Sequence, residues 1–156
     1  MGAFHGVVIK SSVVETRSIE MQRMLVYASR CVTAKSHGWS MEFDDTDLEL
    51  RSPDGHAELR VRPYQCASSP ALSDLHALIS QLPESHGKSI TETQVGQYYG
   101  YVFDSVDPKD GMFIRDHVVS LAEIVLDITF FCPDGTQDQY LPQLQPILES
   151  LCDNRP

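Results

Sequence analysis

Residues 48–62, with the sequence LELRSPDGHAELRVR, decide the fold of this chain. Apolar residues at 48, 50, 57, 59 and 61 alternate with polar or charged ones, which is typical of strands with one buried face. Between the two runs, Ser52-Pro53-Asp54-Gly55 has the composition of a β-turn, because proline presets φ at the second position and glycine relaxes the fourth. The segment therefore predicts a hairpin with one apolar face.

A further strand precedes this hairpin. Trp39, Met41 and Phe43 alternate with Ser40 and Glu42. The same period of two predicts that the three large apolar side chains lie on a buried face.

The pattern changes after residue 66. Leucine and isoleucine at 72, 75, 78, 79 and 82 recur at helical spacing, with Ser69 as the cap, Pro70 at the first helical position and Pro83 as the stop. The polar stretch 84–97 predicts a connection. Residues 98–103, 112–121 and 124–131 are rich in aromatic and β-branched residues and predict three strands, the last two joined by Ala122-Glu123.

The two ends of the chain are less regular. Apolar residues between 140 and 151 predict a closing helix, with Thr136 and Gln139 spaced as a capping box. Pro146 cannot donate a hydrogen bond inside that helix, so the sequence predicts either a kink or a late start at Pro142. Near the N-terminus, residues 7–9 predict a short strand and residues 21–32 a helix, although residues 24–28 fit a strand nearly as well.

Together these elements predict an α+β fold. It is a single-domain α/β sandwich of residues 1–156, with a mostly antiparallel sheet, flanking helices, a core at 38–152 and an N-terminal extension at 1–34. At this length one core can bury most of the unfolded surface.

The order of elements and several short motifs resemble the PsbP/Mog-like α/β sandwiches, a group that includes the bacterial DcrB-like proteins. The motifs are Gly38-Trp39, the 59–62 strand, Gly100-Tyr101, the strand end 128–132 and the helix segment 147–151. This resemblance implies a mostly non-enzymatic function, since the group includes photosystem-associated subunits, a Ran-binding protein and bacterial adaptors or chaperones for secreted effectors.

Charge narrows the set of partners. The chain carries 22 acidic against 12 basic residues, a formal net charge of −10. Such a field repels nucleic acid and anionic membranes, whereas it attracts a basic protein or serves solubility alone. No apolar run is long enough to span a bilayer, and the start lacks a secretory signal, so the sequence predicts a cytoplasmic protein whose four cysteines are free thiols.

No catalytic, cofactor or metal motif stands out. Gly87-Lys88-Ser89 lacks the glycine that a phosphate-binding loop needs five residues earlier, and the six histidines are scattered without metal-ligand spacing. Asp116 and His117 with a distant thiol are the residues from which an enzyme site could be assembled. A small hydrolase-like enzyme therefore stays open as an alternative.

The residues predicted to contact a protein partner are Asp44, Asp45, Asp47, Glu49 and Tyr98. The four acids concentrate negative charge around one turn, where a basic partner would be attracted. Tyr98 belongs to a cluster with Tyr99 and Tyr101, and alternation sends Tyr98 to the opposite side of the strand from the other two.

The functional prediction is a non-catalytic acidic protein-binding module, in concrete form a bacterial immunity protein or an adaptor or chaperone for a secretion effector. Its partner is a protein, in particular a basic toxin or effector. A second alternative is a homodimeric structural protein that pairs through an exposed sheet edge or aromatic patch.

Overall fold

The structure, a computed structural model, describes residues 21–23, 32–43 and 47–153. The predicted strand at 7–9 lies outside these residues. The described elements, in chain order, are β1 (Met21–Arg23), β2 (Val32–Thr33), β3 (Ser40–Phe43), β4 (Leu48–Arg51), β5 (Glu58–Cys66), α2 (Leu72–Ser80), the 3-10 turn η1 (Pro83–Ser85), β6 (Thr91–Val95), β7 (Tyr98–Val106), β8 (Met112–Leu121), β9 (Ile124–Pro133), α3 (Gln137–Glu149) and β10 (Cys152–Asp153).

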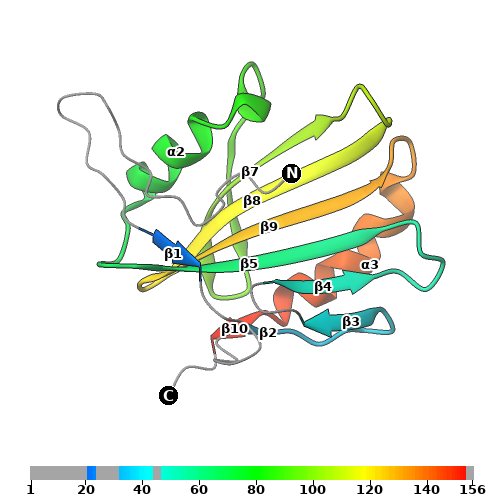
Figure 1. Cartoon of the computed structure of the whole chain (residues 1–156), viewed down its shortest axis with the longest axis horizontal. Helices are drawn as coiled ribbons and strands as arrows, with labels where there is room; N and C mark the ends of the chain where they lie inside the picture. Colours follow the sequence, from blue (N-terminus) through cyan, green and yellow to red (C-terminus); the bar gives the residue numbers. More distant parts are fainter. Residues whose placement is uncertain (1–20, 24–31, 44–46, 154–156) are drawn as a thin grey trace.

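One antiparallel sheet dominates the molecule (Figure 1). Its strands run in the order β3-β4-β5-β9-β8-β7-β6, and β1 pairs with the C-terminal end of β5. A separate two-stranded sheet joins β10 to β2. The α+β sandwich predicted from the sequence is confirmed.

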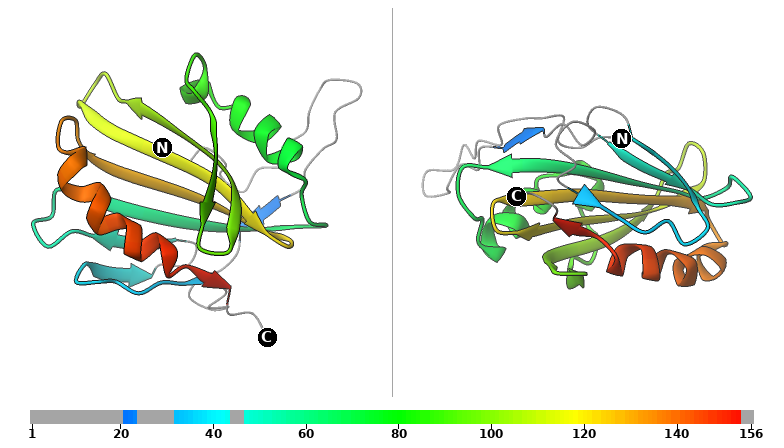
Figure 2. Two further views of the ribbon diagram at one scale, coloured as in Figure 1. Left: turned by 180° about the vertical axis from the view of Figure 1, so that it is seen from behind. Right: turned by 90° about the horizontal axis from the view of Figure 1, so that it is seen from below.

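The two helices pack on opposite faces of this sheet, as the register of the strands shows. Leu59 lies opposite Phe130 and Leu126 lies opposite Val119, and all four side chains face α3, which lies in front of β5 and β9 when the sheet is seen from behind (Figure 2). Tyr64 and Val125 point the other way and pack against α2. We call these sides the α3 face and the α2 face.

Loop geometry fixes the start of β3. Gly38 has a φ of +91°, a left-handed conformation that glycine adopts without strain, and the Trp39 amide donates to the Ser36 carbonyl at 3.0 Å. The turn places Trp39 in the core, where its indole N–H donates to Gln143 Oε1 of α3 at 3.2 Å.

The strand then leaves the core, and Met41 and Phe43 are each 38% exposed. The prediction that they are buried is wrong, because β3 is the border strand of the described sheet and has a neighbouring strand, β4, on one side only.

The sequence predicts residues 91–95 as part of a connection, and that prediction is wrong, because they form strand β6. They read Thr-Glu-Thr-Gln-Val, so no apolar alternation marks them as a strand. They pair with β7 along their whole length and form the border of the sheet opposite β3.

Helix α3 runs continuously from Gln137, so the predicted late start at Pro142 is wrong. Both Pro142 and Pro146 lie inside it, on its exposed side. Water can there hydrate the carbonyls whose helical donors the prolines remove. Thr136 does not cap the helix through its side chain, because its hydroxyl donates to the Pro133 carbonyl instead.

Other boundaries differ by smaller amounts. Helix α2 begins at Leu72, with Ala71 rather than Ser69 at the cap position, and the Asp74 carboxylate accepts from the Ala71 amide at 2.9 Å. The predicted helix at 21–32 is contradicted at both of its ends, which are strands β1 and β2. Its middle lies outside the described residues.

Neither described helix has the length and hydropathy that crossing a membrane requires.

Candidate functional site

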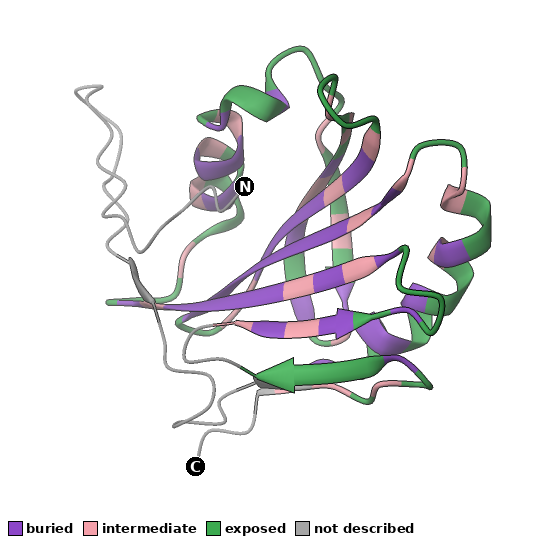
Figure 3. Cartoon of the chain, turned by 45° about the vertical axis from the view of Figure 1, so that its right-hand side comes forward, coloured by how far each residue is buried: buried purple, intermediate pink, exposed green. Residues whose placement is uncertain are grey.

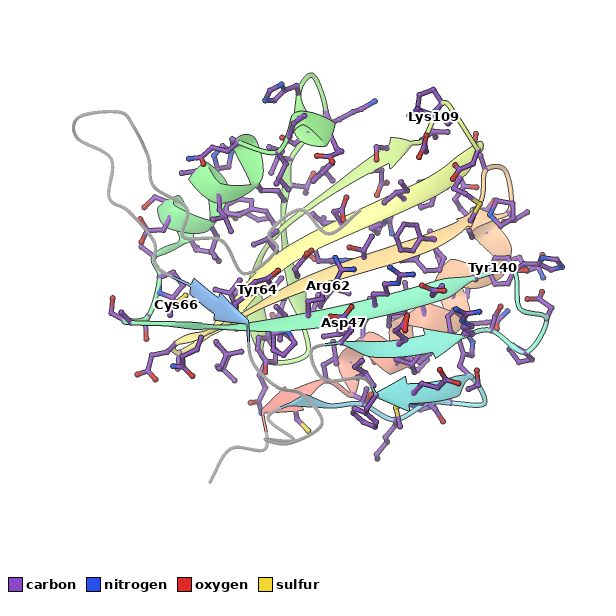
Figure 4. The ribbon with its side chains drawn as sticks, in the orientation of Figure 1. Asp47, Arg62, Tyr64, Cys66, Lys109 and Tyr140 are labelled. Carbon is purple, nitrogen blue, oxygen red and sulfur yellow. The ribbon has the colours of Figure 1, made fainter. Side chains whose placement is uncertain are left out.

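A row of charged side chains crosses the α2 face of the sheet from β4 to β9. Glu49 of β4 and Asp47, which precedes that strand, lie beside Arg60 and Arg62 of β5. Arg62 Nε donates to Asp47 Oδ2 at 3.2 Å, and Figure 4 shows the two side chains pointing toward each other. Arg60 Nε lies 3.5 Å from Glu49 Oε1 and 2.5 Å from Glu58 Oε1.

The row continues into the interior of the molecule. Asp127 on β9 lies directly opposite Arg62 in the register, and further along the strands Thr129 lies opposite Asp116 of β8. All four side chains are buried, and the Thr129 hydroxyl donates to Asp116 Oδ1 at 3.0 Å. Burial works against the charge of Arg62, but the carboxylates of Asp47 and Asp127 outweigh it and hold the pKa of Arg62 above its ordinary value. Arg62 is therefore the cation that stabilises this part of the interior.

For Asp116, neighbouring groups do not outweigh the effect of burial on the pKa. Burial raises its pKa from the ordinary value of 3.8 to about 6, although the hydrogen bond from Thr129 acts in the opposite direction. Between these two values the folded protein binds a proton that the unfolded chain has already released.

The five residues predicted to contact a partner lie in different environments or outside the described residues. Asp44 and Asp45 lie outside the described residues. Asp47 and Glu49 are half-buried and are held by Arg62 and Arg60, so their charges are compensated within the sheet. Tyr98 is fully buried in the core on the α3 face, which contradicts its prediction as a contact residue. Alternation separates it correctly from Tyr99, but it is Tyr99 that is exposed.

Glu42 is an acidic residue that the sequence did not single out. It is exposed on β3, directly opposite Glu49 in the register, and it has no hydrogen bond or ion pair with any described residue. Met41 and Phe43 flank it on the opposite side of the strand. The alternation of residues 39–43 already placed Glu42 on the polar side of the strand. The prediction favoured Asp44 and Asp45 instead, because they form the denser cluster of charge.

We call residues 40–51 the acidic edge. They contain five acids and one basic residue, Arg51. Strand β3 is exposed along its whole length, in contrast to the buried strands at the centre of the sheet (Figure 3). Within the described residues, β3 pairs with β4 on one side only.

The residues from which an enzyme site could be assembled are kept apart by the sheet. Asp116 and His117 are consecutive on β8 and point to opposite faces. Burial and the nearby Arg115 lower the pKa of His117 to about 4, so it is neutral near pH 7. Burial raises the pKa of the Cys66 thiol to about 11, which disfavours the reactive thiolate.

Two open hollows on the surface are lined by described residues. One, of about 460 Å³, is lined in part by Thr91, Thr93 and the pair formed by Asp104 and Arg115, whose guanidinium donates to the carboxylate at 2.7 and 2.9 Å. The other, of about 270 Å³, lies between the 55–58 segment and Phe131. Among the described residues, no three His, Cys, Asp or Glu side chains gather as metal ligands would.

The solved structures that resemble this chain define its fold. LpqN, involved in cell envelope biogenesis of Mycobacterium tuberculosis, superposes with a TM-score of 0.62 at 10% identity, over 88% of this chain and 92% of LpqN. Cyanobacterial PsbP from Synechocystis sp. PCC 6803 superposes with a TM-score of 0.52 at 11% identity, over 92% of this chain and 98% of PsbP. The fold is PsbP-like.

A structure from Bacteroides thetaiotaomicron VPI-5482 also matches, with a TM-score of 0.56 at 10% identity over 81% of this chain. The match covers 46% of that protein, so this chain spans about half its length. No protein family model and no curated protein sequence matches the chain. The predicted resemblance to PsbP is confirmed at the level of the fold, and the resemblance to Mog-like and DcrB-like proteins stays a prediction.

Replacing Arg62 by methionine tests the charged row. The variant leaves Asp47 and Asp127 without their shared cation, so we expect the free energy of unfolding, measured by urea denaturation at pH 7, to fall by about 3 kcal/mol. Arg51→Met removes an exposed arginine that pairs with Glu58 at 3.2 Å, and it should cost less than about 1 kcal/mol. Equal losses in both variants would show that Arg62 has no special role.

Replacing Asp116 by asparagine tests the buried carboxyl. Because the folded-state pKa is raised, the stability of the wild type falls as pH rises from about 4 to about 6. An asparagine side chain does not ionise, so at pH 7 we expect Asp116→Asn to be more stable than the wild type by about 2 kcal/mol, with the difference vanishing near pH 4. Asp110→Asn, at an exposed turn, is the control. A pH-independent difference between wild type and Asp116→Asn would contradict the assignment.

Proposed function

We propose that this chain is a non-catalytic protein-binding module that meets a basic protein partner at the acidic edge. The observation that carries the proposal is the exposed strand β3, where a carboxylate without a cation among the described residues stands between two partly exposed apolar side chains. Exposed apolar residues beside charged ones are typical of protein interfaces.

Electrostatics supports a basic partner. The whole chain carries a formal net charge of −10, and the acidic edge contributes five of its acidic residues within a stretch of twelve. A positively charged protein would be steered toward such a surface, and its association rate would fall as salt increases.

The acids that we propose to attract the partner differ from those predicted from the sequence. Asp47 and Glu49 are paired with Arg62 and Arg60, so they hold the edge together rather than attract a partner. The acids we assign to the contact are Glu42, together with Asp44 and Asp45 in the segment between β3 and β4.

Proteins of similar fold are consistent with a binding function. LpqN is involved in cell envelope biogenesis, and PsbP shares the fold over nearly its whole length. For this chain we propose, more concretely, an immunity protein or an adaptor or chaperone for a secreted effector. In each case the partner would be a basic toxin or effector.

A pull-down from the source cell with two matched variants tests the proposal. The edge variant combines Glu42→Gln, Asp44→Asn and Asp45→Asn, and the control variant combines Glu92→Gln, Asp107→Asn and Asp110→Asn. Both lose the same three negative charges. We expect wild type and control to recover the same basic protein and the edge variant to recover at least about tenfold less. Equal recovery by both variants would remove the acidic edge as the contact.

A further inference from the structure

Strand β3 is an open sheet border with little protection. Its four residues are all exposed, and within the described part of the chain its outer side pairs with no strand. Natural proteins usually blunt such borders with lysine, proline or a bulge, because unpaired N–H and C=O groups accept another strand. The sequence Ser-Met-Glu-Phe contains neither lysine nor proline.

The apolar side of β3 continues a row of the core. Met41 lies opposite Leu50 and Phe43 opposite Leu48, and both leucines are fully buried. The row therefore ends at two side chains that are each 38% exposed. A strand added outside β3 would cover them with its own apolar residues, which point to the same face when they stand directly opposite.

The polar side of β3 ends in an electrostatic mismatch. Glu42 lies directly opposite Glu49, and like charges in that position destabilise a sheet. Arg60 contacts Glu49 at 3.5 Å on the inner side, whereas Glu42 has no such cation among the described residues. A cation on an added strand, opposite Glu42, would relieve this repulsion from the outer side.

From these three features we propose that β3 binds an extended segment of the partner by strand addition, and that this segment has an apolar, cationic, apolar sequence with the cation opposite Glu42. This proposal rests on the proposed function and adds the mode of binding and the sequence class that is recognised. It belongs to the general mode in which main-chain hydrogen bonds supply affinity and alternate side chains supply specificity.

A second copy of this chain fits the same border poorly. In an antiparallel pair of two β3 strands, residues opposite each other must lie on the same face. The register that sets Met41 against Phe43 of the other copy also sets the two Glu42 side chains against each other. The register that sets Met41 against Met41 places Glu42 opposite Ser40, which provides no cation. Two chains of net charge −10 also repel each other.

Peptides of defined sequence test the proposal directly. The probes are two blocked peptides, TTVKVTT and TTVEVTT, titrated into the full-length, ¹⁵N-labelled chain and followed by backbone amide chemical shifts. We expect the lysine peptide to shift amides of β3 and to bind the wild type about fivefold more tightly than the glutamate peptide.

Charge exchange separates strand addition from general attraction. Glu42→Lys should reverse the preference, so that the glutamate peptide binds more tightly, and Glu42→Gln should abolish it. The matched control is Glu92→Lys, which makes the same exchange on β6 at the opposite border and should keep the wild-type preference. An unchanged preference in both Glu42 variants, peptide shifts that avoid β3, or a dimer of the free chain that occupies β3 would each overturn the proposal.

The pull-down distinguishes this failure from failure of the proposed function. If the edge variant loses its natural partner while charge exchange at residue 42 has no effect on the peptides, the protein-binding function stands and strand addition falls. If the edge variant keeps its partner, the assignment of the acidic edge as the contact surface is wrong.

Discussion

Strand β9 holds the sheet together, because it is buried on both faces and hydrogen-bonded on both sides. Every residue from Ile124 to Phe130 is buried, and β5 and β8 pair with it over eight and ten positions respectively. A strand in this position needs a partner layer on each face. Helix α3 covers one face, and on the other face α2 covers only the end near Tyr64 and Val125.

The charged row lies on the α2 face, beyond Val125, the residue of β9 that packs with α2. Asp127 and Thr129 of β9 are buried there, and Arg62 supplies the cation that compensates the buried Asp127 carboxylate. That arginine also pairs with Asp47, and Arg60 pairs with Glu49. The sheet thus pairs the acids at 47 and 49 with arginines, whereas Glu42, the third described acid of the acidic edge, has no cation among the described residues. The proposed contact follows from how the buried charges are paired.

The sequence predicted most of this sheet, because strands with one apolar face carry a strong period of two. Strands β4, β5, β8 and β9, the turn at Ala122-Glu123 and helix α2 all lie near their predicted positions. The failures share a cause, which is that they depend on packing rather than on local pattern. Strand β6 has no apolar alternation, and the prolines of α3 lie where only the folded structure shows that water can reach the freed carbonyls.

The sequence predicted acidic contact residues at 44–49, but it did not show how the charges of Asp47 and Glu49 are paired. Arg62 neutralises Asp47 from 15 residues further along the chain. Arg60 neutralises Glu49 from 11 residues further along. Only the register of β4 and β5 makes these residues neighbours. Likewise, alternation separates Tyr98 from Tyr99 but does not say which side is the core. Pairing across strands decides both questions, and a single sequence contains no direct record of it.

Residue-resolved amide hydrogen exchange of the free protein compares the centre of the sheet with its border at β3. Because β9 is paired on both sides, we expect its amides to exchange only through global unfolding, whereas the amides of β3 that point away from β4 should exchange nearly as fast as in an unfolded chain. Protection throughout β3 equal to that of β9 would show that this border is already covered and is not open to a partner strand.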